Sequence, residues 1–223
     1  MTKNSPRPVF ANIFAFPSNR ATLGGTAYLI LDKAEGRSVN ILIDCPPLTD
    51  ESLEFLEQRG GVTWMVITHR DGRGESRQIQ ERLGCPLVIQ EQEAYLLPGC
   101  DVRPFQHELA LTPLSQLIWT PGYSPGSACL YYGGYGGVLF SGRHLLPHRS
   151  TVLAPVKFAK TFHWPRQLRQ VEALKQRWPA EQLSYVCSGA STGLLRGNYA
   201  IAAAHQALQT LDLESLKQQV PLL

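Results

Sequence analysis

A polar loop placed directly after an apolar run is the feature that most constrains this chain. Trp64-Met65-Val66-Ile67 has the character of a buried strand. The loop Thr68-His69-Arg70-Asp71-Gly72-Arg73-Gly74 follows, and beyond it Ile79 and Leu83 recur at helical spacing. The sequence therefore predicts a strand, a short charged loop and a helix, which together are typical of α/β proteins.

Further motifs follow in a fixed order. Residues 118–127 read Ile-Trp-Thr-Pro-Gly-Tyr-Ser-Pro-Gly-Ser, residues 138–143 read Val-Leu-Phe-Ser-Gly-Arg, and residues 185–190 read Tyr-Val-Cys-Ser-Gly-Ala. Two earlier apolar segments, 27–30 and 41–44, are expected to form paired strands. In this order the motifs resemble those of the metallo-β-lactamase superfamily, whose hallmarks are Thr-His-x-His-x-Asp-His and His-Thr-Pro-Gly-His-(Thr/Ser)-Pro-Gly-Ser.

The resemblance covers roughly residues 23 to 190 and implies the fold of that superfamily. We therefore expect an α/β protein, an αββα sandwich of the metallo-β-lactamase type, with residues 1–223 in a single domain. The string 161–168, Thr-Phe-His-Trp-Pro-Arg-Gln-Leu, is also similar to degenerate relatives found in oxygenic phototrophs.

Most metal ligands of the resembled motifs are absent from this chain. His69 matches the first histidine of the hallmark loop, whereas the other ligand positions hold Asp71, Arg73, Gly74, Tyr123, Arg143 and Ala190. A catalytic metal needs about three protein donors drawn from imidazole, carboxylate or thiolate. Arginine adds a permanent positive charge where cations would sit. The pattern therefore predicts a degenerate protein, a pseudoenzyme with no bound metal.

A rebuilt metal site is the exception that the sequence leaves open. Zinc, iron or manganese would then be held by His69 and Asp71 together with His144 or His163, since ligands need only meet in space. Scattered histidines are more often structural or surface residues than ligands. We therefore expect no cofactor.

The substituted positions suggest a different use of the pocket. The planar guanidinium of arginine donates paired hydrogen bonds to carboxylate or phosphate. We predict that Arg73 and Arg143 form an anion site in which Tyr123 and His69 are further donors. The protein would be a non-catalytic ligand-binding or regulatory protein, and its partner a small anion or another protein.

Two alternatives stand beside the anion site. In the first, the arginines only fill space, with Arg143 paired to Asp71 or Asp44, and function lies in protein contacts through a surface of Phe14, Phe16 and Trp164. In the second, the chain hydrolyses an ester, thioester or phosphodiester with a rebuilt or metal-independent site. Its catalytic residues are unknown, and the candidates are His69 and Asp71.

Composition excludes several other classes of protein. The net charge of +3 is small and spread along the chain, which gives no support for nucleic-acid binding. No apolar run approaches the ~20 residues of a membrane helix, and residues 1–6 lack the apolar core of a secretory signal. The five cysteines show no Cys-x-x-Cys spacing, so we expect reduced, buried thiols. The sequence thus favours a cytoplasmic protein of unknown oligomeric state.

The remaining periodicity predicts three further helices and one more strand. A helix containing Leu53 and Leu56 should end at Gly60-Gly61, and a strand should begin at Pro86. Pro165 should open a helix that Pro179 ends, and the last helix should span 201–211. Residues 91–112 show little periodicity. The first dozen residues and the tail 214–217 should be loosely attached.

Overall fold

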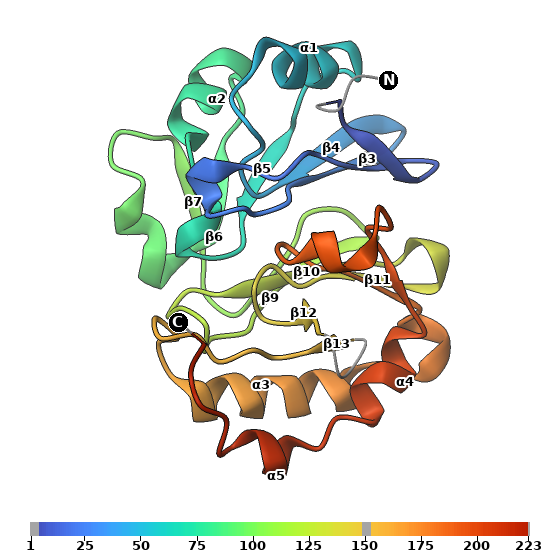
Figure 1. Cartoon of the computed structure of the whole chain (residues 1–223). Coiled ribbons are helices and arrows are strands. Elements are labelled where there is room, and N and C mark those ends of the chain that lie inside the picture. The colour runs from blue at the N-terminus through green and yellow to red at the C-terminus, as the bar shows by residue number, and fades with distance from the viewer. Residues whose placement is uncertain (1–4, 149–152, 223) are drawn as a thin grey trace. The chain divides into compact units, whose positions relative to one another are not determined.

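The computed structural model of this protein describes residues 5–148 and 153–222. The chain divides into two compact units, residues 1–106 and 107–223. Each unit contains a β-sheet and helices (Figure 1). The predicted α/β class is therefore confirmed. That residues 1–223 form a single domain stays a prediction.

The first unit is built on a seven-stranded sheet whose strands follow chain order. Strands β1 to β4 pair antiparallel, and β4 to β7 pair parallel. A two-residue turn at Glu35-Gly36, both with positive φ, joins β3 to β4, as a tight hairpin requires. The strands are β1 (Arg7–Phe10), β2 (Ile13–Ala15), β3 (Tyr28–Ala34), β4 (Arg37–Ile43), β5 (Trp64–Ile67), β6 (Leu87–Gln90) and β7 (Val102–Phe105).

Helices α1 (Asp50–Gln58) and α2 (Ser76–Leu83) cover one face of this sheet (Figure 1). Leu56 and Ile79 are fully buried and belong to one apolar cluster with side chains of the strands. The side chain of Thr49 caps α1 by accepting from the backbone N–H of Ser52. Three short 3₁₀ helices complete the unit: η1 (Arg20–Thr22), η2 (Arg70–Gly72) and η3 (Glu91–Leu96).

The second unit is built on a six-stranded sheet in the order β15-β14-β11-β10-β9-β8. The parallel neighbours β11 and β14 end side by side, and the backbone N–H of Gly189 donates to the carbonyl of Gly142 at 2.8 Å. The loops that carry Arg143 and Ala190 are thereby adjacent. The strands are β8 (Glu108–Ala110), β9 (Ser115–Trp119), β10 (Ala128–Tyr132), β11 (Val138–Phe140), β14 (Tyr185–Cys187) and β15 (Ile201–Ala202), with a separate pair β12 (Leu146–Pro147) and β13 (Leu153–Ala154).

Helix α3 (Trp164–Arg177) packs its buried side chains into the apolar core of this unit. Its Val171 and Leu174 join a cluster with Leu208 of helix α4 (Ala204–Gln209). The predicted helix after Pro165 is confirmed. The remaining helices are the short α5 (Leu213–Leu216) and the 3₁₀ helices η4 (Gly134–Gly136), η5 (Ala180–Gln182) and η6 (Thr192–Leu195).

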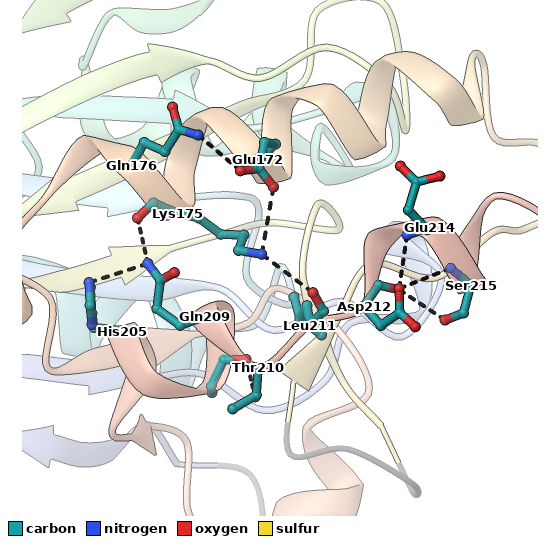
Figure 2. Close-up of polar contacts among 11 residues, drawn as sticks. Glu172, Lys175, Gln176, His205, Gln209, Thr210, Leu211, Asp212, Glu214 and Ser215 are labelled. Carbon is teal, nitrogen blue, oxygen red and sulfur yellow. Dashed lines mark hydrogen bonds and ion pairs between the residues drawn. The ribbon is translucent and has the colours of Figure 1, made fainter.

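Polar contacts join the C-terminal segment to α3. The Lys175 ammonium donates to the carbonyl of Leu211 at 3.3 Å, and the Gln209 side chain donates to the carbonyl of Lys175 at 2.8 Å (Figure 2). The Trp164 indole donates to the carbonyl of Leu216 at 2.9 Å. The expectation of a loosely attached tail is therefore wrong for its residues 214–216.

Other expectations also need correction. Residues 91–112 contain η3, β7 and β8. These elements were not predicted, because the sequence of this region shows little periodicity. The helix expected over 201–211 begins only at Ala204, as α4, because Ile201 pairs with Val186 as a strand, and the separate helix α5 follows it. Residues 7–10 form β1 and pair with β2, so most of the first dozen residues are attached, and residues 1–4 lie outside the described part. Finally, Phe14, Phe16 and Trp164 are all buried, so they cannot form the exposed surface proposed for them.

Candidate functional site

The charged loop predicted after β5 forms the 3₁₀ helix η2. His69 occupies the position before this helix with an extended backbone and is only 2% exposed. A Cβ atom added to Gly72 would lie 2.3 Å from Oδ1 of Asp44 and 2.8 Å from Nδ1 of His69. The Asp44 carboxylate and the His69 ring therefore both crowd this glycine. Sequence reasoning did not identify Asp44 as a neighbour of His69. The signal was present, because Asp44 directly follows β4 and His69 lies just beyond β5, which pairs parallel with β4.

Gly74 stands at the last histidine position of the resembled motif, and its surroundings leave no room for a side chain. Its φ is +41°, and an added Cβ would lie 2.9 Å from both Cβ and Sγ of Cys45 and 3.0 Å from Cγ2 of Thr22. Such distances are shorter than ordinary carbon contacts. The buried Cys45 side chain thus fills part of the space in which a ligand would stand.

Asp71 and Arg73 line a cleft of about 460 Å³ that belongs entirely to the first unit. Arg70 adds a second guanidinium, and Ala21, Leu23 and Leu96 supply apolar lining. The Arg73 side chain is exposed, and its Nη1 donates to the carbonyl of Leu96 at 3.2 Å. This hydrogen bond orients one of the two arginines predicted to bind an anion.

Two of the predicted anion-binding residues, Tyr123 and Arg143, lie in the second unit. Tyr123 is fully buried, and the Arg143 guanidinium lies 5.9 Å from the centre of its ring. The Lys160 ammonium lies 5.8 Å from the same ring centre, and Phe158 packs against the ring edge to face. The structure therefore places Tyr123 and Arg143 together. Ala190, the last ligand position, is buried in a small apolar cluster.

His144 is a buried histidine beside Arg143. It is 1% exposed, and neither ring nitrogen has a hydrogen-bond partner among the described residues. Burial lowers the pKa of His144 from its ordinary value of 6.5 to about 3, because the charged imidazolium is poorly solvated there. The backbone carbonyl of His144 accepts from the side chain of Gln167 at 3.0 Å. Because its pKa is low, the imidazole ring of His144 is neutral at pH 7.

His163, the other histidine considered as a ligand, caps helix α3. Its Nδ1 accepts from the backbone N–H of Arg166 at 3.1 Å. A histidine seldom serves as a helix cap, and the sequence signal there was Pro165 rather than His163. Of its two ring nitrogens, Nε2 is the one left for a further hydrogen bond.

The residues present do not fit a catalytic metal. Within residues 5–148 and 153–222, no cluster of three or more His, Cys, Asp or Glu side chains has the geometry to hold a metal ion. His69 and Asp71 are the donors left in the hallmark loop, and Arg73 follows them with a permanent charge. Two donors fall short of the about three that a catalytic site uses.

The cysteines give no sign of a nucleophile. All five thiols are free, and Cys45, Cys85, Cys129 and Cys187 are buried, whereas Cys100 is half-buried. Burial raises the pKa of Cys187 far above its ordinary value, which stabilises the unreactive thiol. The expectation of reduced, buried thiols is confirmed for four of the five cysteines.

Comparison with solved structures identifies the architecture. A β-lactamase domain protein from Burkholderia ambifaria superposes with a TM-score of 0.66 at 15% identity, covering 97% of this chain and 78% of that one. An archaeal metallo-β-lactamase superfamily protein from Sulfolobus tokodaii gives 0.64 at 12% identity, covering 95% and 88%. This chain has the metallo-β-lactamase fold. TTHA1623 in a di-iron-bound form gives 0.61 at 21% identity, covering 84% and 94%.

The metallo-β-lactamase fold is thus shown by structure rather than by sequence. No protein-family model matches the chain, and no curated protein matches it either. At these identities the likeness establishes the fold alone, and it carries no activity. The roles predicted for His69, Asp71, Arg73, Tyr123, Arg143, His144 and His163 stay predictions. Within the described residues, no helix has the length and apolar character needed to cross a bilayer.

Proposed function

We propose that this metallo-β-lactamase-fold protein is a non-hydrolytic protein that binds small anions. The observation that carries the proposal is the cleft of the first unit, in which Arg73 stands at a former ligand position and is oriented by Leu96. Guanidinium stays charged at any ordinary pH and matches the geometry of carboxylate and phosphate oxygens. An arginine fixed at the wall of a cleft is therefore suited to hold an anion.

The charge balance of the cleft supports the same ligand class. Arg70 and Arg73 outnumber Asp71, so the lining is positive. A cleft concentrates the field of such charges and attracts counter-ions from solution. We further propose that Arg143 binds an anion within the second unit, since it and Lys160 place two cations beside the buried Tyr123 ring. The protein would act in the cytoplasm, with the anion as its partner.

Metal ions are bound in two of the structural neighbours. One is an N-acyl homoserine lactone hydrolase with its product bound at the catalytic metal centre, and another is the di-iron-bound protein. The described residues of this chain offer no comparable donor set. We therefore propose that the cleft binds its ligand without cleaving it.

One observation favours a metal-independent hydrolase as a second candidate. The Asp44 carboxylate and His69 Nδ1 both approach Gly72, so an aspartate could orient a histidine base. Against it, His69 is almost fully buried, and a general base must reach its substrate. Loss of turnover in His69→Ala, with any ester, thioester or phosphodiester, would support the hydrolase.

Metal content is the first measurement to make. The full chain would be expressed with zinc, iron and manganese present, and loosely bound ions removed before elemental mass spectrometry. We expect far less than one metal ion per chain. Near-stoichiometric metal would contradict the proposal and would direct mutagenesis to His144 and His163.

Calorimetric titration with phosphorylated and carboxylated metabolites tests the anion site. We expect Arg73→Ala to weaken binding by roughly 10- to 100-fold, the equivalent of a charge-assisted hydrogen bond. Arg143→Ala tests the second unit in the same way. Arg103→Ala is the matched control, because Arg103 is an exposed arginine of the first unit that does not line the cleft. Unchanged binding in both test variants would refute the site.

A further inference from the structure

We propose that the groove between α3 and α5 binds a carboxylate with an aliphatic chain, the chemistry of a fatty acid. The groove lies in the second unit and has a volume of about 520 Å³. It is a second site, separate from the anion-binding cleft proposed for the first unit. Its apolar floor and the charge that it leaves unpaired together define the ligand.

Apolar side chains from both helices form the floor of the groove. Trp164, Pro165 and Leu168 come from α3, and Leu213 comes from α5. Trp164 and Leu168 are one helical turn apart, about 6 Å along the axis, so they form a continuous apolar strip. The one polar atom of the indole, Nε1, already donates to the carbonyl of Leu216 at 2.9 Å. The Trp164 ring therefore offers apolar surface to a ligand.

Hydrogen bonds fix α5 and the turn that precedes it. Oδ1 of Asp212 accepts from the backbone N–H groups of Glu214 and Ser215, both at 3.1 Å (Figure 2). The Lys175 ammonium of α3 donates to the carbonyl of Leu211, just before this cap. Both walls of the groove are thus in place before a ligand binds. Its volume also falls in the range of roughly 300–1,000 Å³ that is usual for small-molecule sites.

Among the described residues, four charged side chains line the groove, and three of them are already paired. The Lys217 ammonium lies 2.6 Å from the Glu214 carboxylate. The Glu172 carboxylate lies 3.6 Å from the Lys175 ammonium (Figure 2). Arg169 is exposed and has no hydrogen bond or ion pair with any other described residue. The groove thus leaves one guanidinium unpaired, which matches a single carboxylate on the ligand.

The order of these residues along α3 sets the direction in which the ligand lies. Arg169 follows Trp164 by about 7.5 Å along the helix axis, and the apolar floor lies between them. On the other side of Arg169 stands Glu172, whose carboxylate repels an anion. A carboxylate bound to the Arg169 guanidinium therefore directs its chain over Leu168 toward Trp164. Covering this apolar surface removes it from water and favours binding.

Titration of the full chain with four probes tests the inference. The probes are octanoate below its micelle concentration, octylammonium, which has the opposite charge, butyrate, which has a shorter chain, and inorganic phosphate, which has none. We expect octanoate to bind at least ten-fold more tightly than octylammonium or phosphate. From butyrate to octanoate, affinity should rise roughly three- to four-fold with each methylene group. Equal binding of octanoate and octylammonium would overturn the inference.

Nuclear magnetic resonance locates the bound probe. The indole N–H of Trp164 gives its own signal in a proton–nitrogen spectrum, and this signal is assigned by its loss in Trp164→Phe. We expect octanoate to shift the Trp164 signal in step with the binding curve, because the chain covers this ring. Binding of octanoate that leaves the Trp164 signal unchanged would place the ligand elsewhere and refute the groove.

Arg169→Glu then tests the group that holds the carboxylate. We expect this variant to bind octylammonium in preference to octanoate, a gain that an unfolded variant could not show. Arg196→Glu is the matched control, because Arg196 is an exposed arginine of the same unit that does not line the groove. It should keep the preference for octanoate. An unchanged preference in Arg169→Glu would refute the assignment.

The outcomes separate this groove from the cleft of the first unit. Octanoate binding that survives Arg73→Ala and is lost in Arg169→Glu supports the groove. The opposite result, loss in Arg73→Ala alone, would place the carboxylate in the cleft and refute the groove while keeping the proposed function. If octanoate does not bind, the groove is refuted as well, and the cleft still stands or falls with its own titration.

Discussion

The carboxylate of Asp44 accepts hydrogen bonds from both the backbone N–H and the hydroxyl of Thr68. The N–H lies 2.8 Å from Oδ1, and the hydroxyl lies 2.9 and 2.7 Å from Oδ1 and Oδ2. Asp44 follows β4 in the left-handed conformation, with φ of 57°, and Thr68 follows the parallel neighbour β5. This buried contact ties the two strand ends together and fixes the start of the loop that carries His69 and the cleft residues.

Removal of the Thr68 hydroxyl tests this contact. We expect Thr68→Val to lower the free energy of unfolding by about 1–3 kcal/mol, because it leaves a buried carboxylate short of a donor. Urea unfolding followed by tryptophan fluorescence measures the change. Thr210→Val is the control, since the Thr210 hydroxyl bonds locally on an exposed helix end and should matter by no more than about 0.5 kcal/mol. Equal effects of the two substitutions would contradict the assignment.

The crowding at Gly74 gives a second prediction. Gly74→Ala should destabilise the protein by about 1–3 kcal/mol more than Gly36→Ala. Both glycines have positive φ, but nothing lies within 4 Å of a Cβ added at Gly36, so the control carries the backbone cost alone. Thermal or urea unfolding compares the two. Equal losses of stability in the two variants would show that Cys45 and Thr22 can move to make room for a side chain at Gly74. A histidine could then be restored at this position.

The buried ring of His144 predicts a loss of stability in acid. Its pKa is about 3 in the folded protein and 6.5 in a model peptide. Between pH 3 and pH 6.5 the unfolded chain therefore binds a proton at this ring that the native state does not bind. As pH falls through this window, stability should fall by about 1.4 kcal/mol per pH unit from this residue, and the effect is absent above pH 6.5. NMR titration of the ring should show it neutral at pH 5. A midpoint near 6.5 would refute the prediction.

Thiol reactivity should separate Cys100 from the other cysteines. Burial raises the pKa of Cys45 to about 12, of Cys85 to about 11 and of Cys129 to about 12, and little thiolate forms at pH 8. We expect one thiol per chain to react quickly with a disulfide reagent in the native protein and the rest only on unfolding. Cys100→Ser should abolish the fast reaction. A fast phase that survives this substitution would assign it to another thiol.

Local patterns were sufficient for much of the scaffold. Apolar runs such as 64–67 and 138–140 became β5 and β11, and the periodicity after Pro165 became α3. Helices α1 and α2 end just before Gly60-Gly61 and Gly84, where glycine readily adopts the positive φ that the chain has there. The short strands β7 and β8 were not predicted, because they take their stability from pairing with other strands rather than from their own composition.

For the candidate site, too, some properties could be predicted from the sequence and others depended on the fold. The sequence alone determined which residue types occupy the motif positions, among them two arginines, a tyrosine, and the donors His69 and Asp71. Only tertiary structure decided that Asp44 meets Thr68 and crowds Gly72, that Cys45 fills the space beside Gly74, and that His144 is buried. Residue identity is local information, whereas distance, burial and the resulting pKa depend on which segments the fold brings together.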